Sequence, residues 1–206
     1  MLNKNKRIIN LELITKANQL RKEAKLILNN LDLIKILKKI SEPKIVGSLA
    51  YNLMLTRDID IHAYVNEFSI EKILNLLPQL AILPTIRKVQ FSNYREFRKD
   101  HRKDRIGFPH GYYIGIHSMQ NHNEWKIDIW FIKKGEDKSF YNPKLKNLSS
   151  KQREIILNLK NSYLGKNGYK KGLLSIDFYK AVLDFGVKNK KDFENYIKNK
   201  ENRKII

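Results

Sequence analysis

Two stretches of this chain alternate between apolar and polar residues with a period of two, and both place aspartate on the polar side. The first, RDIDIHAYV at 57–65, contains Asp58 and Asp60, and the second, EWKIDIWFI at 124–132, contains Asp128. A period of two is typical of β-strands that bury one face. We therefore expect two strands, each of which carries aspartate. A lone carboxylate buried at such a position would be energetically costly.

The spacing of the first two acids points to a cation. Side chains two residues apart leave the same face of a strand, so Asp58 and Asp60 are expected about 6 to 7 Å apart along it. Their repulsion requires a counter-charge, which a divalent cation supplies, and hard carboxylate oxygens suit Mg²⁺ or Mn²⁺ rather than zinc. Chance often produces an Asp-x-Asp pair, and solvated acids beside Arg57 on an edge strand are the alternative.

A Gly-Ser pair precedes these acids by a helix-sized gap. Gly47 and Ser48 end a short predicted strand at 44–48, and SLAYNLML at 48–55 has the spacing of a brief helix. Backbone N–H groups at such a turn can hold phosphate oxygens, glycine allows close approach, and the serine hydroxyl adds a donor. The alternative is an ordinary strand-to-helix turn that Ser48 caps.

Taken together, these residues resemble the motif of a known superfamily. They are a Gly-Ser turn, an Asp-x-Asp pair and a later aspartate on a neighbouring strand, namely Gly47, Ser48, Asp58, Asp60 and Asp128. The set is similar to that of the DNA polymerase beta-like nucleotidyltransferases, and the resemblance spans residues 45 to about 132. Many relatives carry Gly-Gly at the first motif, and Gly-Ser is a common version.

The resemblance implies a two-metal mechanism. In it, Asp58 and Asp60 would hold Mg²⁺ or Mn²⁺ bound to the triphosphate of an NTP, and Asp60 and Asp128 would hold or flank a second ion that activates an acceptor hydroxyl. The outcome would be transfer of a nucleoside monophosphate with release of pyrophosphate. Lys126 shares the strand face of Asp128, so it is either a phosphate contact or an ion-pair partner.

The expected fold class is α+β, with a mixed central sheet of the nucleotidyltransferase type, N-terminal helices and a C-terminal helical region. The corresponding segments are 1–42, 43–145 and 146–206. Strands are expected at 44–48, 57–65, 85–91, 111–118 and 124–132, the last two joined as a hairpin by the turn-rich QNHN. Helices are expected at 10–29, 31–41, 69–77, 149–165, 175–186 and 191–200. Ser69 should cap the third of these helices, and Pro78 should end it.

The charge of the chain favours a polyanionic partner. It has 41 Lys and Arg against 21 Asp and Glu, for a formal charge of +20, which points to RNA, such as tRNA, as the acceptor. Lysine is abundant throughout, so a merely solvated surface explains the charge equally well. Arginine is a more informative signal of phosphate binding than lysine in this chain. Four arginines form our candidate acceptor or nucleic-acid contact: Arg95, Arg98, Arg102 and Arg105. A charged exposed helix or loop is the alternative.

Other polar and aromatic residues receive structural interpretations. His62 shares the face of Asp58 and Asp60, and packing or surface placement is favoured over a role as a base. Aromatic residues of the expected hairpin are assigned to packing, with base stacking as the lesser alternative: Tyr112, Tyr113, Trp125 and Trp130.

Composition narrows the remaining classes. The chain has no cysteine, so disulfides and thiolate metal sites are unavailable. The first residues lack the apolar core of a signal peptide and no stretch approaches a membrane span, so we expect a cytoplasmic protein without a membrane partner. An antibiotic hydroxyl or a protein side chain are alternative acceptors. The rival functions are a catalytically inactive relative that binds nucleic acid and a helical, basic interaction protein whose motif match is accidental.

Overall fold

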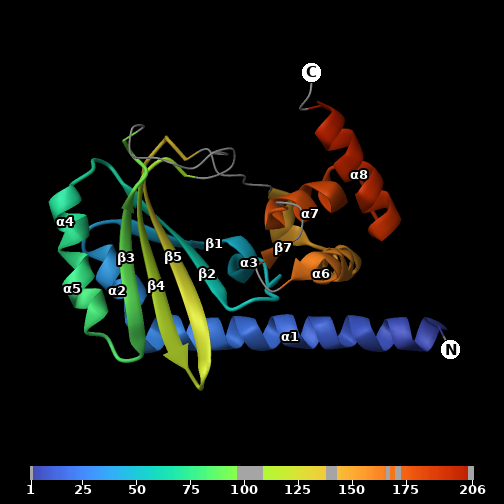
Figure 1. Ribbon diagram of the computed structural model, residues 1–206, viewed down its shortest axis with the longest axis horizontal. Helices are drawn as coiled ribbons and strands as arrows, with labels where there is room; N and C mark the ends of the chain where they lie inside the picture. Colours follow the sequence, from blue (N-terminus) through green and yellow to red (C-terminus); the bar gives the residue numbers. More distant parts are fainter. Residues whose placement is uncertain (1, 97–108, 138–142, 166–167, 170–172, 204–206) are drawn as a thin grey trace. The chain divides into compact units, whose positions relative to one another are not determined.

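The computed structural model describes residues 2–96, 109–137, 143–165, 168–169 and 173–203 (Figure 1). It divides into two compact units. The sheet unit comprises Leu20–Ala50 and Thr56–Phe140, and the helical unit comprises Met1–Gln19, Tyr51–Leu55 and Tyr141–Ile206. The segment boundaries expected after residues 42 and 145 stay a prediction.

The sheet unit is built on a five-stranded mixed sheet of order β1-β2-β5-β4-β3. Its strands are β1 (Glu42–Val46), β2 (Asp58–Val65), β3 (Ile86–Asn93), β4 (Tyr112–Gln120) and β5 (Asn123–Lys133). The central pair, β2 and β5, is parallel, and the other pairs are antiparallel. The predicted α+β class with a mixed sheet is confirmed, and a purely helical interaction protein is excluded.

The sheet has an apolar face because isoleucines alternate with polar residues along parts of β2 and β5. Ile59 and Ile61 on β2 and Ile127 and Ile129 on β5 are fully buried, and burying each such side chain contributes about 1.5 to 3 kcal/mol. Three short helices of this unit supply further buried residues: α2 (Leu33–Lys38), α4 (Ile70–Leu74) and α5 (Leu76–Ala81). They are grouped against the sheet in Figure 1. The intervening strand positions, which carry the aspartates, face the other way.

The predicted hairpin between β4 and β5 is confirmed, and its turn sets the strand register. Asn121 and His122 form a two-residue loop with φ values of 47° and 62°, as a type I′ turn requires, and asparagine tolerates this conformation well. Because Gln120 pairs with Asn123, every later pairing along the hairpin follows by counting from the turn.

Several helix boundaries differ from the predictions. Helix α1 (Leu2–Asn30) begins eight residues earlier than expected. Ser69 caps α4 as predicted, since its hydroxyl accepts a hydrogen bond from the Lys72 N–H at 3.4 Å. The prediction that Pro78 ends a helix was wrong, because Pro78 lies in the first turn of α5, where its missing N–H forfeits no hydrogen bond.

The brief helix after the Gly-Ser pair is shorter than predicted. Helix α3 spans only Gly47–Ala50, and Asn52 has a φ of 56°, a left-handed conformation that cannot continue a helix. Ser48 therefore lies inside the single turn rather than before it.

The helical unit confirms the predicted C-terminal helices. They are α6 (Ser150–Tyr163), α7 (Ser175–Leu183) and α8 (Lys190–Arg203), with the 3-10 helix η2 (Pro143–Asn147) and the short pair β6 (Leu164–Gly165) and β7 (Gly168–Tyr169). Phe178 and Phe193 stack with ring centroids 4.8 Å apart, and Tyr163 meets Phe193 edge-on at 5.2 Å. Within the described ranges, no helix has the length and apolarity needed to cross a membrane.

Candidate metal centre

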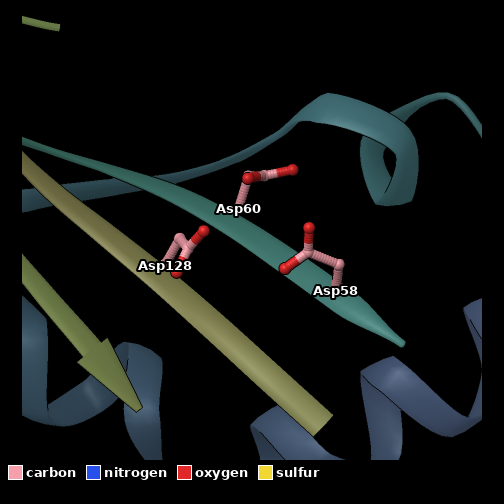
Figure 2. Close-up of side chains that lie close together, drawn as sticks. All are labelled: Asp58, Asp60 and Asp128. Atoms are coloured by element: carbon pink, nitrogen blue, oxygen red, sulfur yellow. The ribbon is translucent and has the colours of Figure 1, made fainter. Parts of the chain in front are cut away.

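The three aspartates singled out by the sequence lie together on the polar face of the sheet. Asp58 and Asp60 project from β2 and Asp128 projects from the adjacent strand β5 (Figure 2). One carboxylate oxygen from each lies within 4.8 Å of the others, and all three side chains are half-buried. Asp60 and Asp128 are direct partners in the parallel register. Like charges placed directly opposite each other destabilise a sheet, so this face requires positive charge.

Lys126 supplies part of that charge. It stands opposite Asp58 in the register, and its ammonium donates a hydrogen bond to Asp128 Oδ2 at 2.6 Å. Burial alone would lower the pKa of Lys126, but the hydrogen bond to Asp128 and the charges of the three acids outweigh it, so the pKa lies above its ordinary value. Lys126 is therefore an ammonium ion held within the acid cluster, as its shared strand face suggested.

Tyr113 holds the other oxygen of Asp128. Its hydroxyl donates to Asp128 Oδ1 at 2.5 Å. Burial raises the pKa of Tyr113, and the hydrogen bond to Asp128 raises it further, so the side chain stays a neutral phenol that can donate. Gly115, which pairs with Asp128 across the strands, leaves the space for this contact. A Cβ atom at Gly115 would lie 2.5 Å from the Tyr113 hydroxyl oxygen.

Sequence reasoning assigned Tyr113 to hairpin packing, and its contact with Asp128 was missed. A signal was available in the hairpin turn. Counting outward from Asn121 and His122 pairs Gly115 with Asp128 and Tyr113 with Trp130, and this places the tyrosine beside the acid on the same face of the sheet.

Gly47 brings the Gly-Ser turn against the acid cluster. Its φ is +62°, a conformation that L side chains rarely adopt, and a Cβ atom there would lie 2.3 Å from Asp60 Oδ2. Only glycine fits between the turn and the carboxylate. Ser48 follows directly in α3, and α3 contacts β2, the strand that carries Asp58 and Asp60.

His62 lies one step further along β2 and is tied to another acid. Its Nδ1 atom is 3.2 Å from Asp137 Oδ2, and the Tyr64 hydroxyl donates to the same oxygen at 2.5 Å. His62 is buried. The packing role expected for His62 is consistent with this arrangement, and Asp137 was not singled out by the sequence.

The arginine cluster is only partly described. Arg98, Arg102 and Arg105 lie outside the described residues, and their predicted contact with an acceptor stays a prediction. Arg95 forms an ion pair with Glu136, and its guanidinium lies 4.9 Å from the centroid of the Phe68 ring. Arg95 therefore already has two partners within the protein, and it would have to contact an acceptor in addition to these.

The three aspartates fit a divalent cation with hard oxygen ligands. Magnesium binds oxygen at about 2.1 Å, so two ligands of one ion lie at most about 4.2 Å apart, and paired ions lie about 3.5 to 4 Å apart. The carboxylate oxygens lie within 4.8 Å of one another, so they would have to move only slightly closer together to hold one ion or two. The donor set contains no sulfur or imidazole, which favours Mg²⁺ or Mn²⁺ over zinc.

No protein-family model matches the chain, and no curated protein matches it either. The structure itself, a mixed sheet that brings three aspartates together beside a Gly-Ser turn, is compatible with a nucleotidyltransferase-like fold.

Proposed function

We propose that this chain is a metal-dependent nucleotidyltransferase that moves a nucleoside monophosphate from an NTP to a hydroxyl acceptor. The observation that carries the proposal is the convergence of Asp58, Asp60 and Asp128 from two adjacent strands. The position of Gly47 against Asp60 adds a glycine turn directly beside the acids, and a glycine backbone carries no side chain that would keep a phosphate away.

The resemblance to the nucleotidyltransferases suggests a role for each acid. Asp58 and Asp60 would hold the ion that accompanies the triphosphate, and Asp60 and Asp128 would hold or flank a second ion. Bound Mg²⁺ or Mn²⁺ would supply charge neutralisation at the phosphates and a lowered pKa for the acceptor hydroxyl. Tyr113 fixes the orientation of the Asp128 carboxylate through the hydrogen bond to Oδ1.

The phosphate contacts would come from the other residues of this face. Gly47 and Ser48 would contact phosphate oxygens through the backbone and the serine hydroxyl. Lys126 would offer its ammonium to the same anion. In the transfer, the acceptor oxygen forms a bond to the α-phosphorus, and the bond to the bridging oxygen of the pyrophosphate breaks. The hydroxyl proton passes to solvent, and pyrophosphate leaves.

RNA is the acceptor that the charge of the chain favours. A formal charge of +20 attracts a polyanion. A tRNA is such a polyanion, and its end carries a hydroxyl. An antibiotic hydroxyl and a protein side chain are the other acceptors to be compared.

The test is transfer of label from each α-³²P NTP, with Mg²⁺, to total cellular RNA or to protein. The wild type is compared with the Asp58→Asn, Asp60→Asn double variant and with Asp32→Asn as a matched control. Asp32 has a φ of 48°, which asparagine tolerates, so the control should keep full transfer. Label moved by the wild type and the control, and lost in the double variant, supports the proposal. Folded protein that binds RNA but transfers no label with any NTP favours the inactive binding relative instead.

A further inference from the structure

We propose that Lys126 is the internal counter-ion of the acid cluster, and that a divalent cation displaces its ammonium from Asp128 when it binds. The inference rests on the proposed function, because it concerns the same three acids. It assigns Lys126 a second state, in which the released ammonium meets the phosphates of a polyphosphate ligand.

The charges of the face define the first state. Three carboxylates converge within 4.8 Å, and Lys126 stands opposite Asp58 while its Nζ atom lies 2.6 Å from Asp128 Oδ2. Lys126 brings one positive charge to these three carboxylates, whereas a divalent ion brings two. A divalent ion and Lys126 would then compete for the same carboxylate.

The two donors on Asp128 differ in their freedom to move. The Tyr113 ring is buried and packs against Trp130 at a centroid distance of 5.0 Å, so the bond to Oδ1 is held by the sheet. The side chain of Lys126 is 44 % exposed, and its flexible four-carbon stem can redirect the ammonium. Tyr113 therefore keeps the carboxylate oriented, and Lys126 is the partner that can leave.

Displacement would couple metal binding to polyphosphate binding. While Lys126 is bonded to Asp128, its charge is shared with that carboxylate and is less available to an anion. A metal ion that takes over Asp128 frees the ammonium, which remains within reach of the same face. Metal and polyphosphate would therefore each strengthen the binding of the other, and this coupling would depend on Lys126.

Chemical labelling of lysine amines tests the displacement directly. Wild-type protein is treated with acetic anhydride at one fixed pH, with and without saturating Mg²⁺, and the labelled sites are read by mass spectrometry. Labelling of Lys126 should rise with Mg²⁺, because its ammonium leaves the ion pair. Labelling of Lys72, an exposed lysine on α4, should not change. Unchanged labelling of Lys126 at metal saturation would overturn the inference.

Mn²⁺ titration without nucleotide supplies the second readout. Lys126→Met should bind Mn²⁺ about fivefold or more tightly than wild type, the lower end of ordinary site couplings, while Lys126→Arg and Lys72→Met should stay near wild type. Adding pyrophosphate should tighten Mn²⁺ binding in the wild type and do so less in Lys126→Met.

The outcomes separate this inference from the proposed function. Equal Mn²⁺ affinity in wild type and Lys126→Met overturns the counter-ion role and leaves nucleotidyl transfer to be decided by the labelled NTP assay. Absence of Mn²⁺ binding in the wild type overturns the counter-ion role and the metal dependence together. Stronger binding with Lys126→Met in a protein that transfers no label supports the inference and contradicts only the proposed reaction.

Discussion

Asp60 on β2 and Asp128 on β5 face each other directly across a parallel pair of strands. Such a pair of like charges costs folding free energy unless positive charge lies beside it, and the proposed metal ion would supply that charge in addition to Lys126. At Asp60, stability and function should therefore respond in opposite directions.

Replacing Asp60 with Asn should stabilise the metal-free protein while abolishing transfer. Removing one of two opposed charges should raise the free energy of unfolding by about 0.2 to 1 kcal/mol. Asp128→Asn should instead lower it by about 1 to 3 kcal/mol, because an amide cannot accept both the Lys126 and Tyr113 hydrogen bonds in the same way. Urea unfolding with a chelator present measures both changes. Equal destabilisation by the two variants would contradict the repulsion.

Gly47→Ala should damage both stability and metal binding. The left-handed backbone costs about 1 to 2 kcal/mol for an alanine, and the new Cβ displaces Asp60 Oδ2. Gly135 is the matched control, since its φ is +84° and nothing lies within 4 Å of its Cβ position. Gly135→Ala should show the backbone cost with Mn²⁺ affinity unchanged. A Gly47→Ala protein that keeps wild-type affinity would show that the turn does not constrain Asp60.

Tyr113→Phe should lower transfer through Asp128 without unfolding the sheet. The lost bond to a carboxylate is worth about 1.5 to 3 kcal/mol, and the freed Asp128 should bind metal less well. Tyr112→Phe is the control, because Tyr112 lies next to it on the opposite face of β4. Gly115→Ala, which pushes the Tyr113 hydroxyl aside, should reproduce the Tyr113→Phe defect. The comparison needs kcat and KM for each variant, and equal defects in both tyrosine variants would rule out the specific contact.

Divalent metal should stabilise the folded protein by an amount that rises with the logarithm of its free concentration divided by its Kd. At a free concentration one hundred times the Kd, a ligand that binds only the folded state adds about 2.7 kcal/mol. The midpoint temperature of thermal unfolding should therefore rise with increasing Mg²⁺, and it should return to the starting value when a chelator is added. The Asp58→Asn, Asp60→Asn variant should show no shift. A similar rise in that double variant would place the stabilising metal elsewhere.

Local patterns were enough to predict the strands, their polar face and the hairpin. The alternation in 57–65 places Asp58 and Asp60 on one face whatever the fold, because side chains on a strand repeat every two residues. Local rules failed where a residue has two permitted roles. Pro78 can end a helix or occupy its first turn, and only the helix boundaries in the structure decide which.

The tertiary structure decided how strands far apart in the chain pair with one another. Nothing in 57–65 specifies that β2 pairs in parallel with β5, or that the register sets Asp60 opposite Asp128. That pairing joins residues far apart in the chain and depends on how the whole apolar face is covered. The contact of Asp60 with Gly47 depends on a second tertiary pairing, in which β1 and β2 set Val46 opposite Asp60. The sequence by itself thus determined the kind of groups available for a metal site, and the packing of the sheet brought those groups within reach of one another.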